Sequence, residues 1–401
     1  MTFNSRRHWV TALGSGLLAG ALAIPAVQAA AAPEAGPQQA GLQQADLQQA
    51  VTAKVNATKS SKARTAGIQV NVTRGAGTGS VFGTTVALAP KGQDTHPEGW
   101  LFAARLVDGK WQVGLEGERT FSDLAADSPV VSAKEKQLFG QSFAPQAAGG
   151  DFRTGMRLPF ATGVSWTMPG GPHGWGGTDT PYSAVDLAGG NGQVLAARGG
   201  TAYTMCGNGK GWIRVIHDRG YSTDYYHLFG NIAANGLAVS EGTFLGNIGT
   251  DVSCGGAADG AHVHFALRQN SAYVGIAGHN LGGWVFQNAA SAYNGTALHG
   301  STLRGPGQAL YNYGALGFTQ GIIDSFGGTS VNKRTGPGTN YALAGSVADG
   351  TTVNISCSKN GTSHTGRWGT SSLWNRLSDG TWVSDAFMWT GSAAPVNGTC
   401  P

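Results

Sequence analysis

The stretch Gly260-Ala-His-Val-His-Phe-Ala-Leu267 decides how the middle of this 401-residue chain folds. Successive side chains of a β-strand point to opposite faces, so His262 and His264 share one face and the apolar residues beside them share the other. The alternation predicts a half-buried strand that presents two imidazoles on its open face. Two adjacent imidazoles suit a metal site, where one binds the metal and the other moves protons. Two ordinary surface histidines would give the same pattern.

The composition favours β-structure with many turns. Glycine accounts for 65 of the 401 residues, while charged residues make up only 12%. Glycine at this level, together with frequent Thr, Ser, Val and aromatic residues, is typical of short strands joined by tight turns. The length allows two or three domains.

The charge distribution argues against nucleic-acid binding. Residues 1–150 carry 13 basic and 10 acidic side chains, residues 151–305 carry 8 of each, and residues 306–401 carry 5 and 4. A nucleic-acid binder needs a concentrated basic face, and the later part of the chain is nearly neutral. We therefore expect no nucleic-acid partner.

The N-terminus has the pattern of a secretory signal. Arg6 and Arg7 precede an apolar run over residues 9–27, and small residues with an Ala-x-Ala pattern follow. A membrane anchor is the alternative, but glycines and Pro25 interrupt the run. We predict a signal peptide over residues 1–30, a secreted protein in the extracellular space, and no membrane anchor after cleavage.

Residues 31–150 are predicted to form an α+β or β pro-region. A Gln- and Ala-rich stretch over residues 33–60 is expected to be disordered or a short helix. Alternating segments joined by Asp108-Gly109 then predict a β-hairpin. We see no catalytic constellation here, so this region is expected to shield a groove or assist folding. A plain accessory domain is the alternative, and residues 142–150 are predicted to be a processing linker.

Strands and turns continue through residues 151–305, which we predict to be the catalytic domain. Gly-Gly, Asn-Gly and Arg-Gly breakers separate the segments. The predicted strands cover residues 193–197, 201–205, 212–217, 222–228 and 262–268.

Three further side chains could join the histidine pair. They are His173 in a Gly- and Pro-rich loop, Asp186 on an alternating segment, and His227 in Ser-Thr-Asp-Tyr-Tyr-His-Leu. A catalytic zinc site uses three protein ligands and keeps one position open. His173, Asp186 and one member of the pair would supply these ligands. The remaining imidazoles would then move protons or stabilise charge, since their ordinary pKa is about 6.5.

These motifs resemble the β-lytic and LasA-type staphylolytic metallopeptidases, which are relatives of lysostaphin. The resemblance spans roughly residues 159–284 and rests on the His173 to Asp186 spacing, the Ser-Thr-Asp-Tyr-Tyr-His-Leu string and the Gly-Ala-His-Val-His-Phe-Ala-Leu string. It implies an antiparallel β-sheet domain around an open groove. It also implies cleavage of glycine-containing peptide bonds in bacterial peptidoglycan.

Carried over by residue, the resemblance implies one Zn²⁺ per chain held by His173, Asp186 and His264. His262 and His227 become the catalytic pair, without a decision on which is the general base. Tyr225 and His279 are expected as possible substrate contacts, although a core position for Tyr225 is an equal alternative.

The remaining histidines are expected to lie outside the site. His217 is predicted to be structural, because it ends a strand before a turn. His299 and His364 are predicted to lie on the surface.

The four cysteines predict two disulfides. In an exported chain an even number of cysteines implies a disulfide framework. Two fall in each predicted domain, which favours Cys206–Cys254 and Cys357–Cys400. A zinc–thiolate cluster is the alternative, but no C-x-x-C spacing occurs.

Residues 322–401, after a linker over 306–321, are predicted to form a small β-barrel. The opening Val331-Asn-Lys-Arg-Thr-Gly-Pro-Gly-Thr-Asn-Tyr341 resembles bacterial SH3-like domains. That resemblance implies binding to the cell wall. The tryptophans here are expected to be mainly core residues.

Together these observations predict a mainly β, monomeric, secreted zinc endopeptidase that is made as a zymogen and lyses bacterial cell walls. One alternative is a general extracellular metalloprotease. The other is a non-catalytic wall-binding protein with a degenerate peptidase domain, but all five site positions are filled here.

Overall fold

The computed structural model describes residues 37–58, 65–77, 79–141 and 151–401. The predicted signal peptide and the predicted processing linker fall outside the described residues. Within the described ranges the chain is mainly β, as the sequence predicts. No helix in these ranges is long and apolar enough to cross a membrane.

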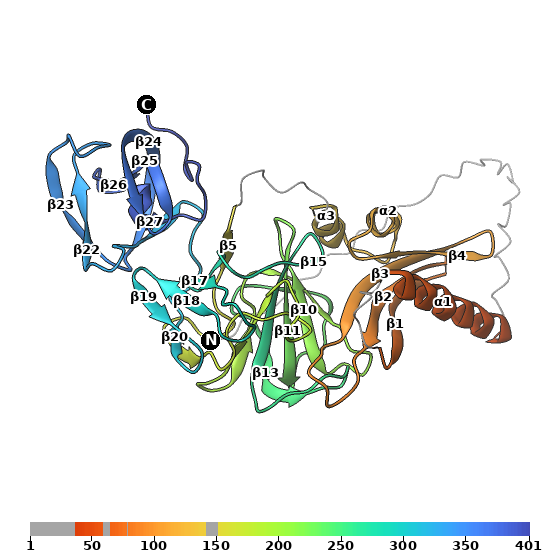
Figure 1. Cartoon of the computed structure of the whole chain (residues 1–401). Helices are drawn as coiled ribbons and strands as arrows, with labels where there is room; N and C mark the ends of the chain where they lie inside the picture. The colour runs from red at the N-terminus through yellow and green to blue at the C-terminus, as the bar shows by residue number, and fades with distance from the viewer. Residues whose placement is uncertain (1–36, 59–64, 78, 142–150) are drawn as a thin grey trace, which may run out of the picture. The chain divides into compact units, whose positions relative to one another are not determined.

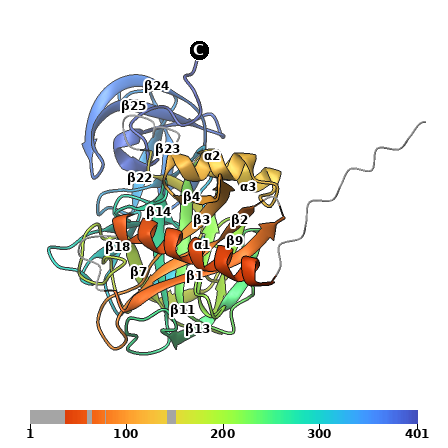
Figure 2. The same ribbon diagram turned by 90° about the vertical axis from the view of Figure 1, so that its right-hand side faces the viewer.

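The N-terminal part consists of an antiparallel sheet with helices packed on it. Helix α1 (Pro37–Thr58) lies in the Gln- and Ala-rich stretch, so the helical alternative is correct for these residues. Its Leu47, Val51 and Val55 are spaced four apart, which puts them on one face, and they pack against the sheet (Figure 2). The other elements are β1 (Gly67–Ala76), β2 (Ser80–Leu88), β3 (Glu98–Val107), β4 (Lys110–Leu115), α2 (Arg119–Asp127) and α3 (Ala133–Gln141).

The predicted hairpin at Asp108-Gly109 is confirmed. Strands β3 and β4 are antiparallel, and Val107 pairs with Lys110 across the turn. Asp108 and Gly109 have φ values of 48° and 74°. Positive φ at both central residues is the geometry of a type I′ turn, whose twist matches that of the flanking strands.

The predicted catalytic domain, residues 151–305, is built on a nine-stranded sheet in which each of the five predicted strands overlaps an observed one. The main path runs β12-β9-β10-β11-β13-β8, and β14 pairs with β11, β15 and β7. Figure 1 labels β10, β11, β13 and β15 of this sheet. The strands are β7 (Ala184–Leu187), β8 (Gln193–Leu195), β9 (Gly200–Thr204), β10 (Gly211–Ile216), β11 (Tyr221–Phe229), β12 (Asn235–Val239), β13 (Phe244–Asp251), β14 (Val263–Gln269) and β15 (Ala272–Tyr273).

The two faces of β14 enter different surroundings, as its alternation predicts. Val263, Phe265 and Leu267 are fully buried in the main core of the catalytic domain. On the opposite face, Ala266 joins a second apolar cluster, to which the N-terminal part also contributes Phe82. That cluster also contains Leu101, Ala103, Phe121, Trp175, Tyr203, Trp212 and Tyr226. The N-terminal part and the catalytic domain therefore share one core.

Two smaller sheets extend the catalytic domain. One has the order β19-β18-β17-β16-β5, and the other pairs β20 with β6. Strand β20 lies inside the predicted linker, and its Leu310 is buried in the main core. The strands are β5 (Arg153–Met156), β6 (Ser165–Thr167), β16 (Asn280–Leu281), β17 (Trp284–Gln287), β18 (Thr296–His299), β19 (Thr302–Arg304) and β20 (Ala309–Tyr311).

The C-terminal part is a seven-stranded sheet curled into a half-barrel (Figure 1). Its order is β23-β22-β26-β25-β24-β21-β27, which agrees with the small β-domain predicted here. A 3₁₀ turn spans Asp385–Phe387. The strands are β21 (Gln320–Ile323), β22 (Ser330–Arg334), β23 (Leu343–Ala348), β24 (Thr352–Gly366), β25 (Gly369–Leu377), β26 (Trp382–Ser384) and β27 (Met388–Trp389).

Both predicted disulfides are present. Cys206–Cys254 joins the turn after β9 to the loop after β13, with 5.8 Å between the Cα atoms. Cys357–Cys400 fastens the C-terminal end of the chain to β24. The zinc–thiolate alternative is wrong, since no free cysteine remains. The first bridge restrains the loop that leads toward the histidine pair.

Candidate metal centre and catalytic histidines

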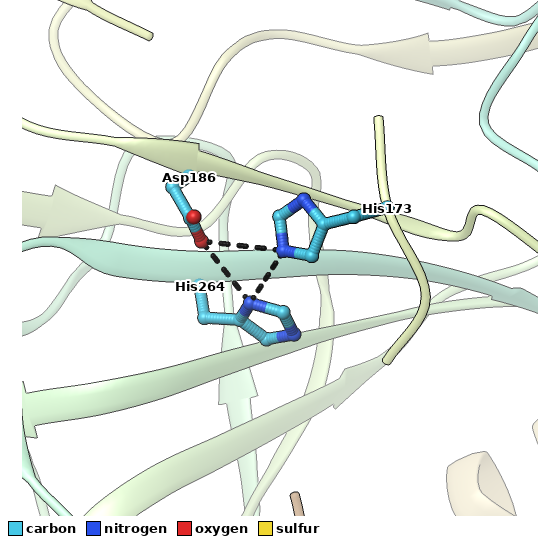
Figure 3. A group of neighbouring side chains, drawn as sticks. All are labelled: His173, Asp186 and His264. Carbon is cyan, nitrogen blue, oxygen red and sulfur yellow. Dashed lines mark hydrogen bonds and ion pairs between the residues drawn. The ribbon is translucent and has the colours of Figure 1, made fainter. Parts of the chain in front are cut away.

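Strand pairing brings three potential metal donors together. Asp186 on β7 is directly opposite His264 on β14 in the antiparallel ladder. His173 forms an isolated bridge with Ala184, at the start of the same β7 strand. Figure 3 shows the three side chains pointing toward one another from these separate segments. The grouping therefore depends on register, which fixes which side chains face each other across a sheet.

The donor atoms have spacings that suit a tetrahedral cation. His173 Nε2 and His264 Nδ1 lie 3.1 Å apart, and Asp186 Oδ1 lies 3.1 Å from His264 Nδ1 and 3.5 Å from His173 Nε2. Zinc–ligand bonds of about 2.0–2.1 Å in tetrahedral geometry separate neighbouring ligand atoms by about 3.3 Å. Among the described residues, His173, Asp186 and His264 form the group of His, Cys, Asp or Glu side chains whose ligand atoms lie close enough together to hold one metal ion. The set fits a divalent ion.

The surroundings keep both ligand imidazoles in the metal-binding form. His173 Nδ1 lies 2.7 Å from the carbonyl oxygen of Gly171, which can only accept, so Nδ1 carries the proton and Nε2 keeps its lone pair. Burial, followed by the nearby His173, lowers the pKa of His264 well below its ordinary value. Both rings are almost fully buried. Neutral imidazoles are what a metal requires.

His227 and His262 form a second pair beside the three donors. Their ring centroids lie 4.8 Å apart, and His262 Nε2 is 3.5 Å from Asp186 Oδ1. His262 Nδ1 lies 2.8 Å from the Gly260 carbonyl, and His227 Nδ1 lies 3.0 Å from the Asp251 carbonyl. Each ring therefore donates through Nδ1 and has its lone pair on Nε2.

His227 reaches the site through an unusual backbone conformation. Its φ is +67°, and the β11–β13 register shifts between His227 and Phe229. A left-handed conformation at a residue with a side chain costs roughly 1–3 kcal/mol and is concentrated at functional sites. Burial, followed by the neighbouring His262, lowers the pKa of His227 to about 4. The ring is thus neutral at physiological pH.

Comparison with known proteins identifies the family. Residues 180–276 match the model described as Peptidase family M23, a span that contains Asp186, His227, His262 and His264. The beta-lytic metalloendopeptidase of Lysobacter enzymogenes is 30% identical over 150 residues, which cover 35% of this chain and 83% of that protein. The chain belongs to peptidase family M23.

Other relatives agree with this membership. Protease LasA of Pseudomonas aeruginosa is 33% identical over 150 residues, and the match covers 35% of this chain and 35% of LasA. The chain therefore matches about a third of the length of LasA. Among solved structures, the deep-sea M23 metalloprotease pseudoalterin has 30% identity, a TM-score of 0.36, and coverage of 39% of this chain and 97% of that chain.

Membership of family M23 assigns a division of chemistry to these residues. His173, Asp186 and His264 would hold a divalent metal, which supplies Lewis acidity and lowers the pKa of bound water to about 7. The Nε2 atoms of His262 and His227 lie beside this centre with lone pairs available. Such imidazoles can accept a proton from water and later return it to a leaving amine.

Two expected substrate contacts of this M23 peptidase lie elsewhere. Tyr225 is fully buried in the main core, where its Oη accepts a hydrogen bond from Ala197 N. The core alternative for Tyr225 is therefore the correct one, and the positive φ of His227 separates that ring from Tyr225. Tyr226 instead lies beside His227, with ring centroids 4.4 Å apart.

His279 is also outside the cluster of metal donors and catalytic histidines. It is buried against Phe152 and Tyr221, with ring centroids 5.2 Å and 6.1 Å away. Burial lowers the pKa of His279 to about 4. The ring is thus packed between aromatic side chains, and the expected substrate contact of His279 stays a prediction.

The predicted positions of the other histidines are only partly correct. His217 is structural, since its ring is bonded to Gly199 O and Thr223 Oγ1, both at 2.9 Å. His299 is not a surface residue: it is buried and stacks on Tyr313, with 3.7 Å between ring centroids. His364 is half-buried. The polar sequence around Gly300 does not indicate that His299 packs on Tyr313.

The sequence analysis missed three groups that border the site. His96, from the N-terminal part, stacks on His264 with 4.2 Å between ring centroids. Tyr293 stacks on His173 at 4.0 Å, and the Trp175 ring lies 5.0 Å from that of His264. His96 is the single histidine between residues 9 and 172, and its isolated position in the sequence could have marked it as a candidate functional residue. The contacts themselves depend on tertiary packing.

Proposed function

We propose that this chain is a secreted zinc endopeptidase that hydrolyses glycine-containing peptide bonds in bacterial peptidoglycan. The observation that carries the proposal is the convergence of His173, Asp186 and His264 at spacings of 3.1–3.5 Å. A tetrahedral site with three protein ligands has one open position, and that position makes a zinc site catalytic rather than structural. We assign one zinc per chain to this site.

We assign the proton-transfer role to His262 and the charge-stabilising role to His227. His262 Nε2 lies 3.5 Å from a metal donor atom, Asp186 Oδ1, so it is within reach of a water at the open position. His227 is farther along the groove, and its ring centroid is 6.1 Å from that of His264. Once its Nε2 has accepted a proton, the His227 imidazolium would donate to the oxyanion that forms when water adds to the scissile carbonyl.

Crowding beside the metal donors supports a preference for glycine. Tyr293 stacks on one ligand ring, and Trp175 packs beside another. Large rings so close to the donors leave little room for side chains next to the scissile bond. A glycine-rich peptide has none to accommodate, whereas a bulky residue would have to displace an aromatic ring.

We further propose the predicted division of the chain: a signal peptide, a pro-region to residue 150, the catalytic domain, and an SH3-like domain that binds the wall. The half-barrel borders a cavity of about 760 Å³ whose lining includes Asn360, Trp368 and Trp389. Aromatic and amide groups of this kind suit a polar, sugar- or peptide-containing ligand. The two disulfides are those of an oxidising, extracellular setting.

Digestion of purified walls with different cross-bridges tests this function. We expect clearing of walls with glycine cross-bridges, and mass spectrometry should find fragments with new glycine amino or carboxyl ends. Equal cleavage of unrelated proteins at bonds lacking glycine would favour a general extracellular metalloprotease. Wall binding without any released fragment would favour a non-catalytic protein.

A further inference from the structure

The segment Ala89–Pro97, which connects β2 to β3 in the N-terminal part, lies along the catalytic domain. Ala89 N donates to Cys254 O at 3.0 Å, Gly256 N donates to Pro90 O at 3.2 Å, and Gly92 N donates to Gly256 O at 2.9 Å. Lys91 and Gly256 form a parallel bridge. The segment therefore pairs through its backbone, by three hydrogen bonds and one bridge, with the loop that the Cys206–Cys254 disulfide restrains. Backbone pairing is a common way to bind an extended peptide.

Two glycines of the catalytic domain make room for this segment. Gly255 and Gly256 have φ values of +102° and +84°. A Cβ atom on Gly255 would meet Ala89 O at 1.8 Å, and one on Gly256 would meet Thr95 O at 2.3 Å. Both distances are far shorter than any van der Waals contact. The loop thus admits a peptide backbone only because it has no side chains at these two positions.

The far end of the segment covers the catalytic histidines. Trp175 Nε1 donates to Pro97 O at 2.6 Å, and the Tyr293 hydroxyl donates to Asp94 Oδ1 at 3.4 Å. Between these anchors the His96 ring lies flat on His264, with 10° between the planes. The His96 Nε2 atom is 3.2 Å from His227 Nε2. Segment residues therefore touch both a metal ligand and a catalytic imidazole.

The contact between His96 and His227 uses the lone pair that catalysis needs. The His227 proton is on Nδ1, which faces the Asp251 carbonyl at 3.0 Å, so His227 Nε2 can only accept. His96 must then donate through its own Nε2–H. His96 is outside the group of converging metal donors found among the described residues. It therefore blocks the catalytic nitrogen and the groove while leaving the metal ligands as they are.

We propose that Ala89–Pro97 is a built-in inhibitor of the metallopeptidase site, with His96 as the residue that occupies His227. This proposal rests on the proposed function, because it takes the segment to lie where the substrate peptide lies. The N-terminal part holds the segment in place because it shares an apolar core with the catalytic domain. Its Glu116 also accepts a hydrogen bond from the buried Arg214, with 2.7 Å between Nη1 and Oε2. The unprocessed chain is consequently inactive until the N-terminal part is removed.

The full-length, unprocessed chain carrying His96→Ala tests the proposal against the wild-type chain. The first measurement is cleavage of a short fluorogenic glycine peptide, for which we expect at least a tenfold faster rate in the variant. The second is carbethoxylation of His227 by diethylpyrocarbonate, read by mass spectrometry, since Nε2 can react only when His96 does not cover it. We expect at least tenfold faster modification in the variant.

Lys91→Ala is the matched control, because Lys91 belongs to the same segment, is exposed, and contributes through its backbone. The Lys91→Ala chain should cleave the glycine peptide as slowly as the wild type, and its His227 should react with diethylpyrocarbonate as slowly. Equal modification of His227 in wild type and His96→Ala would overturn the inhibitor proposal. If His227 becomes reactive in His96→Ala while the glycine peptide stays intact, the inhibitor proposal holds and the proposed substrate is wrong.

Discussion

The N-terminal and C-terminal parts both pack on the catalytic domain, but in different ways. The N-terminal part shares a large apolar cluster with it, contributes the buried Glu116 to Arg214 and Arg268, and reaches the site through His96. The C-terminal half-barrel meets it through a small apolar cluster and through polar contacts such as Ser301–Asp349. This contrast underlies our proposal that the first part controls access to the site and the second part determines where the protein acts.

The largest predicted effect concerns the site that both parts adjoin. His264→Ala should lose the metal and reduce hydrolysis at least about 10³-fold, because Lewis-acid stabilisation worth several kcal/mol disappears. His262→Ala should be as inactive with its metal still bound. Zinc content by elemental analysis, measured together with the hydrolysis rate, separates the two.

The matched control for these variants is His364→Ala, which removes a half-buried histidine in the half-barrel. It should leave zinc content and hydrolysis of a soluble peptide unchanged. Retention of both zinc and activity by His264→Ala and His262→Ala would contradict the assigned roles.

A smaller predicted effect is the loss of folding stability when a contact is removed from either interface with the catalytic domain. Glu116→Ala leaves the buried guanidinium of Arg268 without its carboxylate partner and should cost the unprocessed chain about 3 kcal/mol. Asp349→Ala removes hydrogen bonds to Ser301 and Ser325 at a half-exposed position and should cost about 1 kcal/mol. Denaturant titration measures both. Equal costs would remove the distinction between the interfaces.

A third prediction concerns pH and the half-barrel alone. Burial raises the pKa of Asp385 to about 6, against 3.8 for the ordinary group. The folded state then binds the proton more tightly than the unfolded state, so this group adds stability as pH falls from 6 to 4, by about 2 kcal/mol. Asp385→Asn should remove that increment relative to the wild type. An identical pH dependence in both proteins would refute the prediction, which concerns the unfolding free energy and not hydrolysis.

The smallest predicted effect sharpens the role of the half-barrel. Trp368→Ala removes an aromatic wall of the 760 Å³ cavity and should weaken wall binding about tenfold, as loss of one binding aromatic costs 1–2 kcal/mol. Hydrolysis of a soluble glycine peptide should not change. Phe326→Ala, an exposed aromatic away from that cavity, is the control in a pelleting assay. A loss of soluble-peptide hydrolysis would contradict the division of labour.

Sequence reasoning reached the strands and the metal donors because both follow from short-range pattern. The alternation around His262 and His264 fixes their common face, and that face is observed. Register could not be predicted in the same way: that Asp186 lies opposite His264 depends on how β7 and β14 align. The positive φ of His227 also breaks the simple alternation, which is why the sequence alone could not decide between the core and the site for Tyr225.

His96 shows the limit of reasoning from local pattern. It lies 131 residues from His227 in sequence, on a loop whose composition indicates only a turn. Its contact with the catalytic pair exists because two sheets share a core and because Gly255 and Gly256 admit the loop backbone. Neither condition can be read from the loop itself.

The most direct test of the account is wall clearing by the secreted, active protein with its metal removed and then restored. Removal by a chelator should abolish the loss of turbidity, and addition of zinc to one equivalent per chain should restore it. His173, Asp186 and His264 are the residues that would hold this ion, and we propose that it acts on the cleaved bond. Undiminished clearing in the chelator, with the metal shown to be absent, would contradict the account.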